Sequence, residues 1–239
     1  MASGQPPPGE PEPERFEPDA LAELPAEFAL ARLPVGRHGL PRAFVVRNQR
    51  LRIVAAMLQA LPKHGYPELT IGHLTEEAGV SRAAFYRQFA NKEECFLATY
   101  DLAGEWLCER VEAAAAAQAD WPARVLAGVS EALRLLAGNP PLAHLLAVEV
   151  MQAGPVVRAR QQACLARFAE ALRAGRPQPD ELPVELEEML LGGVVATIGR
   201  YVDGGRVEQL PEATAELVQY LLIPYMEPGE TKRIASQAA

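Results

Sequence analysis

Apolar residues recur at helical spacing along most of the chain after about residue 43, and no segment alternates apolar and polar residues as a strand does. The first clear stripe predicts a helix over residues 43–63. Its apolar positions are Val46, Ile53, Val54, Met57, Leu58 and Leu61. Gly65 follows this stripe, and glycine commonly stands just after a helix. The pattern predicts an all-α protein.

Three more helices are predicted next, and each follows a residue that can cap it. Thr70 precedes the first, which ends at Gly79, a residue type that readily adopts the left-handed conformation of a tight turn. Ser81 would cap a helix over residues 82–89, and Asn91 a long one over residues 92–117. The two helices on either side of Gly79 match a helix-turn-helix.

The rest of the chain predicts further helices, with proline at or near the start of several. They cover residues 120–137, 139–151, 155–174, 180–202 and 210–225. Pro183 interrupts the fourth of these near its start. Residues 229–239 are expected to form a frayed tail, and residues 1–34 a disordered extension rich in proline and acidic residues.

Charge divides the chain in a way that the total conceals. The net charge is −8, yet residues 35–92 carry +6, and the segments before and after them carry −5 and −9. A basic segment inside an acidic chain is the place where an anionic partner such as nucleic acid would bind. We therefore expect residues 35–92 to be a DNA-binding domain with an N-terminal arm.

The second helix of the helix-turn-helix, residues 82–89, has side chains suited to a DNA groove. Arginine can pair with guanine or phosphate, glutamine with adenine, and alanine permits close approach. The helix start at Ser81 offers free N–H groups to a phosphate. The side chains expected on the exposed face are Arg82, Ala83, Ala84, Tyr86, Arg87 and Gln88. From these features alone, a packed helical hairpin with a solvated basic face remains an alternative.

The segment GYPELTIGHLTEEAGVSRAAFYRQFANKEECF, residues 65–96, resembles the N-terminal signature of the TetR family of transcriptional regulators. The resemblance implies a three-helix DNA-binding domain, followed over residues 93–228 by a helical domain that dimerises and holds a ligand pocket. It implies phosphate contacts from Thr70, Tyr86 and Lys92. It also implies base reading from the positions of Arg82, Ala83, Ala84 and Arg87. Gly72 stands where some relatives carry a long base-reading side chain, so the helix before the turn should add little specificity.

The segment before the first firm helix is a candidate DNA-binding arm. Arg37, His38 and Arg42 stand among glycines and prolines. Such an arm can enter the minor groove, which attracts arginine where it is narrow. A disordered linker is the alternative.

The C-terminal part of the chain offers candidate dimer and pocket residues. Two apolar helices suggest a dimer interface through Leu191, Val195, Leu217 and Leu221, although an internal core helix would show the same pattern. Candidate pocket residues are Trp106, Trp121, His144, Met151 and Phe168. Isolated aromatic and methionine residues more often belong to a core.

Other chemistry is poorly supported by the sequence. Cys95, Cys108 and Cys164 stand far apart in the chain, so we expect reduced thiols without a disulfide framework or zinc site. The histidines form no metal-binding pattern, and His144 and Glu149 are too poorly spaced to share a helix face. We expect no catalytic residues, no cofactor, no membrane span and a cytoplasmic location.

The sequence therefore favours a homodimeric repressor that binds a double-stranded DNA operator and is released by a small-molecule ligand. A ligand-independent or activating regulator with the same DNA-binding domain is the first alternative. A helical small-molecule carrier or enzyme is the second, and it lacks a recognisable catalytic set.

Overall fold

The computed structural model describes residues 42–177 and 182–238, and in these ranges the chain is helical and contains no β-strand. This confirms the predicted all-α fold. The α-helices are α1 (Arg42–Glu68), α2 (Ile71–Ala78), α3 (Arg82–Gln88), α4 (Lys92–Ala116), α5 (Trp121–Ala137), α6 (Pro140–Ala147), α7 (Pro155–Gly175), α8 (Leu186–Asp203), α9 (Thr214–Leu222) and α10 (Pro228–Ala235). Short 3₁₀ helices are η2 (Glu149–Met151), η3 (Val207–Ala213) and η4 (Ser236–Ala238).

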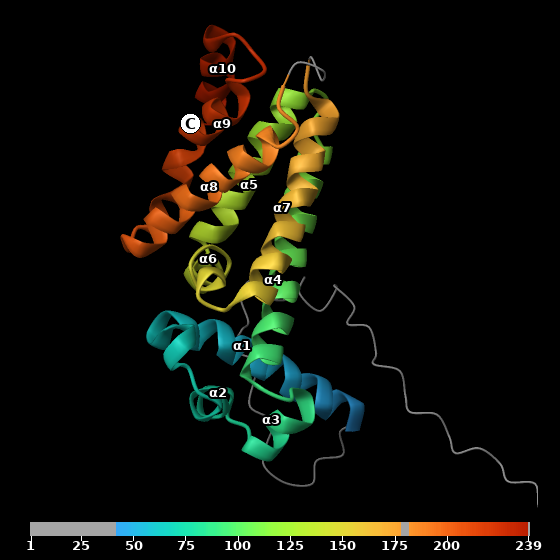
Figure 1. Ribbon diagram of the computed structural model, residues 1–239, viewed down its shortest axis with the longest axis vertical. Helices are drawn as coiled ribbons and strands as arrows, with labels where there is room; N and C mark the ends of the chain where they lie inside the picture. Colours follow the sequence, from blue (N-terminus) through green and yellow to red (C-terminus); the bar gives the residue numbers. More distant parts are fainter. Residues whose placement is uncertain (1–41, 178–181, 239) are drawn as a thin grey trace, which may run out of the picture.

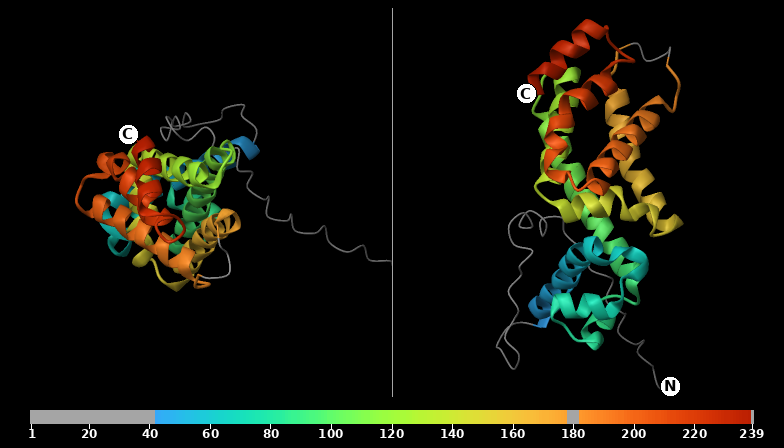
Figure 2. Two further views of the ribbon diagram at one scale, coloured as in Figure 1. Left: turned by 90° about the horizontal axis from the view of Figure 1, so that it is seen from above. Right: turned by 90° about the vertical axis from the view of Figure 1, so that its left-hand side faces the viewer.

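The helices form two groups along the long axis of the molecule (Figure 1). The group α1–α3 occupies one end, and α5 and α7–α10 occupy the other. Figure 2 shows the same division from the side, with α4 running from the first group into the second. α6 lies at the junction, where it contacts α1. A displacement of α4 or α6 would therefore change the packing in both groups of helices.

Capping residues explain where several helices begin. Asp120 and Asn139 accept hydrogen bonds from the backbone N–H groups of Ala123 and Leu142, at the starts of α5 and α6. Each bond satisfies a donor that the helix itself leaves unpaired. Asn91 does the same for Glu94 at the start of α4. These starts agree with the sequence-based expectation.

One hydrophobic core runs through both groups. Phe85, Phe89 and Phe96 are almost completely buried where α3 and α4 pack against α1. The same core continues through Leu133 of α5. A second, smaller core packs α9 and α10 against α5 and includes Trp121, Leu222 and Ile234. Burial of apolar surface is the main source of stability in such helical layers.

Some predicted boundaries were wrong. α1 begins at Arg42, which was placed in the arm, and it continues past a non-helical Gly65 to Glu68. α8 begins at Leu186, after Pro183. The segment expected to be a tail starts with α10, because Thr231, Ile234 and Ala235 find buried positions.

The expected disordered extension, with Arg37 and His38 of the arm, lies outside the described residues. Within residues 42–177 and 182–238, no helix combines the length and the apolar content needed to cross a bilayer.

Candidate DNA interface and ligand cavity

α2 and α3 are joined by a tight turn at Gly79. Gly79 adopts the left-handed conformation, with φ 60° and ψ 41°, and its N–H faces the carbonyl oxygens of Glu76 and Thr75. A residue with a side chain would be strained there. Thr70 Oγ1 accepts a hydrogen bond from His73 N–H, and Ser81 Oγ accepts one from Ala84 N–H. Thr70 and Ser81 thus cap α2 and α3 and remain exposed.

The outer face of α3 presents most of the side chains expected to meet DNA. Arg82, Ala83, Tyr86 and Arg87 are exposed, and Tyr86 retains 56% of its accessible surface. Ala84 does not belong to this face. It is 2% exposed and, like the adjacent Phe85, packs inward. The prediction that Ala84 reads a base is therefore wrong for this geometry.

Part of the basic segment serves to hold α3 in place. Arg50 Nη1 donates to the carbonyl of Gln88 at 2.9 Å, and its guanidinium lies 4.3 Å from the centre of the Phe89 ring. Gln88 Nε2 donates to Val46 O at 3.3 Å. Arg52 is buried and donates to the carbonyls at the end of α2. Gln88 is therefore half-buried and bonded to α1. Because Arg50 and Arg52 also bond within the protein, fewer basic side chains are available to DNA than the net charge of residues 35–92 suggests.

The guanidinium of Arg82 lies beside Gly72. A Cβ atom at position 72 would lie 3.5 Å from Arg82 Nη2. An arginine of α3 is thus the neighbour of the side-chain-free position 72 of α2.

Lys92 lies at the start of α4, beside the end of α1. Its Nζ donates to Tyr66 O at 2.7 Å and lies 4.5 Å from the centre of the Tyr66 ring. Partial burial lowers the pKa of Lys92, and nearby Glu68 opposes that effect. The side chain is half-buried, so a phosphate contact would draw it away from Tyr66.

The junction between the two helical groups contains a buried carboxylate. Glu149 of η2 is 1% exposed, and its Oε2 accepts a hydrogen bond from Tyr66 N–H at 2.8 Å. Its Oε1 lies 3.4 Å from His144 Nδ1. His144 and Glu149 do not share a helix face, and they meet because α6 ends at Ala147 and the chain turns into a 3₁₀ helix.

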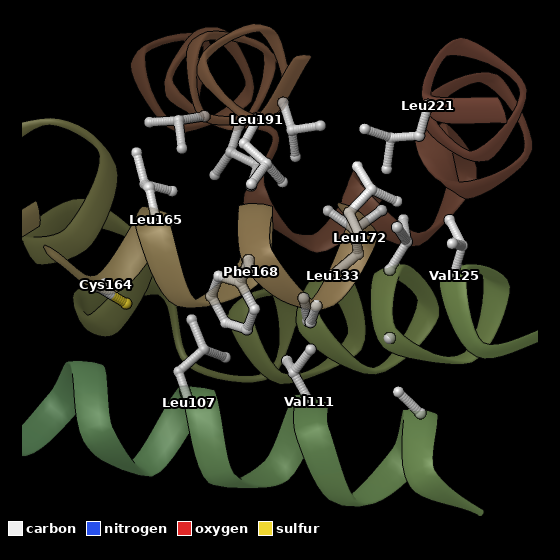
Figure 3. Close-up of a pocket in the computed structure, with 18 of the residues that line it drawn as sticks. Leu107, Val111, Val125, Leu133, Cys164, Leu165, Phe168, Leu172, Leu191 and Leu221 are labelled. Carbon is white, nitrogen blue, oxygen red and sulfur yellow. The ribbon is translucent and has the colours of Figure 1, made fainter. Parts of the chain in front are cut away.

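A large apolar cavity lies between helices α4 to α9. Its volume is about 590 Å³, within the range of small-molecule sites. Figure 3 shows Leu107 and Val111 of α4 on one side and Leu191 on the other, with Phe168 between them. The lining includes few polar side chains, namely Tyr100, Arg124, Gln161 and Cys164. Such a cavity suits an apolar ligand.

Two of the candidate pocket residues, Trp121 and Phe168, line this cavity. Trp106 is 8% exposed and packs in the core, while Met151 is 62% exposed on the surface. His144 faces Glu149 at the junction instead of the cavity. The larger part of the lining consists of leucine, valine and alanine, which carry no distinctive sequence signal.

Gly175 permits the close packing of Trp121 at one end of the cavity. A Cβ atom at position 175 would overlap the Trp121 indole ring. The indole N–H donates to Leu172 O at 3.0 Å, which fixes the orientation of the ring. Both residues line the cavity.

A second cavity, of about 530 Å³, lies on the other side of the contact between α4 and α7. It shares Tyr100, Gly104 and Cys164 with the apolar cavity. Its lining combines apolar residues with charged ones, and we call it the polar cavity because of Arg50, Arg160, Arg167, Asp101 and Glu105. Arg160 lies 3.6 Å from Asp101, and Arg167 lies 2.8 Å from Glu105 and 2.9 Å from Glu112. The two cavities together offer an apolar and a charged compartment.

The candidate dimer residues point into the chain. Leu217 and Leu221 are 4% and 3% exposed, and Leu191 and Val195 line the apolar cavity. The sequence pattern identified the apolar face of α8 and α9, but that face packs within the single chain. Their outer surface presents Met189, Tyr220 and Ile223, which are 68%, 39% and 50% exposed.

Glu187, which the sequence analysis did not identify, lies in the first turn of α8 and joins this helix to the end of α7 and to Tyr225. It is completely buried and bonds to Arg173, Arg176 and Tyr225. Burial works against ionisation, but the hydrogen bonds from Tyr225 and Arg176 hold the pKa of Glu187 below its ordinary value. The pKa of Tyr225 rises to about 12, through burial and the Glu187 charge.

Cys108 and Cys164 are neighbours in space although they are far apart in the sequence. Their sulfur atoms are 3.0 Å apart, across the contact between α4 and α7. Their separation along the chain gave no sign of this contact, and both thiols are free in the structure. In the described part of the chain, no three His, Cys, Asp or Glu side chains gather as a metal site.

Comparison with known proteins identifies relatives of this chain. The sequence profile described as "Bacterial regulatory proteins, tetR family" matches residues 53–99, which span most of α1, all of α2 and α3, and the start of α4. The fatty acid metabolism regulator protein of Bacillus subtilis (strain 168) is 22% identical over 165 residues, covering 65% of this chain and 84% of that protein.

Two solved structures share the fold. FadR from Bacillus subtilis in complex with stearoyl-CoA has a TM-score of 0.64 and 21% identity, covering 72% of this chain and 96% of that chain. The fatty acid degradation regulator FadR from Bacillus halodurans has a TM-score of 0.66 and 20% identity, covering 73% and 94%. The two groups of helices seen here are thus found together in other proteins.

Proposed function

This chain is a transcriptional regulator of the TetR family, and we propose that it is a dimeric repressor released from its operator by a long-chain acyl compound. The observation that carries the proposal is the apolar cavity of about 590 Å³ between α4, α5 and α7–α9. The chain would then combine a DNA-binding surface on α3 with a binding cavity for a small-molecule ligand.

The form of the two cavities supports an acyl thioester as the ligand class. The apolar cavity would take the acyl chain, since burial of each methylene is favourable. The polar cavity, where Arg50, Arg160 and Arg167 outnumber the carboxylates of Asp101 and Glu105, would take an anionic headgroup. The FadR structure from Bacillus subtilis contains stearoyl-CoA, a molecule with both parts.

The DNA contacts are proposed for the exposed side of α3 and its caps. Arg82, Ala83 and Arg87 would face bases. Tyr86, Thr70, Ser81 and Lys92 would face phosphates. Gln88 would contribute only if its bond to Val46 O opened. In a dimer, two such helices would enter successive major grooves about 34–36 Å apart.

The outer surface of α8 and α9 is the proposed dimer contact. Met189, Tyr220 and Ile223 supply exposed apolar area there. These residues replace Leu191, Val195, Leu217 and Leu221, which point inward in the single chain. Exposed apolar area of this kind commonly marks a contact with another protein.

The proposal is tested by selecting duplexes from a random DNA pool and then adding stearoyl-CoA to the complex with the enriched duplex. We expect a near-palindrome, a steep loss of affinity with salt, and release of the duplex by the acyl compound. Enrichment without release would contradict the ligand, and no enrichment would contradict the DNA-reading role. An activator with the same DNA-binding domain would be distinguished by a fall, instead of a rise, in reporter expression after deletion.

A further inference from the structure

Cys108 and Cys164 form a close pair in the wall between the two cavities. Cys108 belongs to α4 and is 1% exposed, whereas Cys164 belongs to α7 and is partly exposed. Their sulfur atoms lie 3.0 Å apart. A disulfide bond is about 2.05 Å long, so the two atoms need to approach by only about 1 Å to be joined.

The two thiols differ in access and in charge environment. Cys164 lines both cavities, whereas Cys108 lines only the polar one. The hydrogen bond between the two sulfur atoms lowers the pKa of Cys164, burial opposes this, and the nearby Arg167 guanidinium lowers it again. The same hydrogen bond, with burial, raises the pKa of Cys108. Cys164 is therefore both the more accessible thiol and the one that ionises first.

Cys95 provides a comparison within the same chain. It is completely buried near the start of α4, and burial raises its pKa to about 12. Reactive thiols combine access with a stabilised thiolate, and buried apolar thiols are inert. Cys95 should therefore stay reduced under conditions that oxidise the pair.

We propose that Cys108 and Cys164 are a redox-active pair that closes into an intrachain disulfide when a hydroperoxide oxidises Cys164. The bond would fix α4 to α7 in the wall that the two cavities share. The pair borders the proposed ligand site, since Cys164 lines both cavities, but closing the bond requires neither ligand nor DNA.

The reaction proceeds in two steps with a hydroperoxide as the oxidant. The Cys164 thiolate attacks the terminal oxygen of the hydroperoxide, forming an S–O bond and breaking the O–O bond, and an alcohol (water, for hydrogen peroxide) leaves after taking up a proton. Cys108 sulfur then attacks Cys164 sulfur, forming the S–S bond and breaking the S–O bond. The hydroxide that leaves takes the Cys108 proton and becomes water. Two thiols lose two electrons, and the hydroperoxide gains them.

Hydroperoxide could reach Cys164 from either cavity. Hydrogen peroxide would enter through the polar one, and an apolar organic hydroperoxide would enter through the apolar one. The first experiment therefore treats the full chain with hydrogen peroxide and, in parallel, with cumene hydroperoxide. Faster closure with cumene hydroperoxide would assign the apolar route, and faster closure with hydrogen peroxide would assign the polar route.

Closure is measured by alkylating the remaining thiols in denaturant and mapping peptides without reduction. We expect a peptide pair joined through Cys108 and Cys164, alkylation of Cys95 alone, and full reversal by dithiothreitol. Oxidation that joins separate chains, or that modifies Cys95 as fast as Cys164, would overturn the proposal.

Substitutions separate the two roles. Cys108→Ser should let a sulfenic acid accumulate at Cys164, detected as a dimedone adduct, because no second thiol resolves it. Cys164→Ser should give neither adduct nor disulfide. Cys108→Ala serves as a second variant should the hydroxyl disturb the buried site, with circular dichroism confirming the fold. Equal dimedone labelling of wild type and Cys108→Ser would overturn the role of Cys108.

A second readout rests on the proposed function and uses stearoyl-CoA as the probe. Closing the disulfide draws α4 and α7 together where a ligand occupying both cavities would pass. We expect oxidised protein to bind stearoyl-CoA at least about fivefold more weakly, at the lower end of ordinary coupling between sites. Cys108→Ser treated in the same way is the control. Unchanged affinity with a mapped disulfide would overturn the regulatory consequence, while the mapping itself is independent of any ligand.

Discussion

The carboxylate of Glu149 accepts a hydrogen bond of 2.8 Å from the backbone N–H of Tyr66 and thereby joins η2 to the end of α1. Tyr66 O in turn accepts a hydrogen bond of 2.7 Å from Lys92 Nζ, at the start of α4. The backbone of Tyr66 is thus bonded both to the buried Glu149 and to Lys92, the residue proposed to contact phosphate. α6, which carries His144 toward Glu149, also lines the apolar cavity through Ala143 and Leu146.

Glu149→Ala should lower the free energy of unfolding by about 1–3 kcal/mol, because Tyr66 N–H loses its acceptor. Glu149→Gln keeps an acceptor oxygen and should cost less. Urea unfolding followed by circular dichroism measures both variants. Glu109→Ala, at an exposed position of α4, is the control. Equal stability of Glu149→Ala and wild type would show that this bond contributes nothing to the junction.

Arg87→Ala should weaken binding to the selected duplex and relax base preference at one position by about 1–3 kcal/mol. The reason is the exposed place of Arg87 on α3, where a guanidinium can form two hydrogen bonds to guanine. Fluorescence anisotropy with single-base variants of the duplex measures the effect. Arg158→Ala, exposed on α7, is the control. Unchanged affinity and preference would remove Arg87 from the interface.

Lys92→Ala should weaken binding to all duplexes alike and reduce the slope of affinity against salt by about one unit. A phosphate contact releases counterions, whereas a base contact discriminates sequence. Salt titrations of wild type and variant measure the slope. A lower affinity with an unchanged slope would instead indicate that Lys92 acts through its bond to Tyr66 O.

Saturated acyl-CoA thioesters of increasing length should bind more tightly by about 0.8 kcal/mol for each added methylene, or roughly fourfold, until the apolar cavity is full. Isothermal titration calorimetry on a chain-length series measures this. Leu107→Trp, which fills space beside Phe168, should end the increase at a shorter chain. Affinity independent of chain length would place the acyl group outside the cavity.

Stability should fall in acid through Glu187. Its pKa is lower in the folded chain than in the unfolded chain, so its contribution is complete above a pH of about 4.5 and is lost as the pH falls through the folded value. Glu187→Gln should remove this pH dependence. It should also cost about 3–5 kcal/mol near neutral pH, because Arg176 would be left buried with a weakened partner. Urea unfolding between pH 3 and 7, settings chosen around the ordinary glutamate pKa, measures both effects. Parallel curves for variant and wild type would contradict the role of Glu187.

The sequence was sufficient for features that depend on neighbouring residues. Asp120, Asn139 and Ser81 cap the helices that their positions predicted, and the turn at Gly79 has the expected conformation. These features arise from hydrogen bonds over three residues or from a single backbone angle, so local pattern is enough to identify them.

Features that join distant segments could not be predicted in this way. The contact between Cys108 and Cys164 depends on how α4 and α7 are packed, and the contact between His144 and Glu149 depends on where α6 stops. Leu217 and Leu221 showed an apolar stripe, but periodicity does not reveal whether a stripe faces its own chain or a second one.

The packing of Gly175 against Trp121 bears on how ligand preference could change among related regulators. Position 175 carries no side chain, and the indole ring occupies the space that a side chain would fill. A larger residue would displace Trp121, and since both residues line the cavity, its length at this end would change. If the proposed function holds, a single substitution far from α3 would therefore alter which acyl chains are sensed while leaving α3, and hence the set of controlled promoters, as it was.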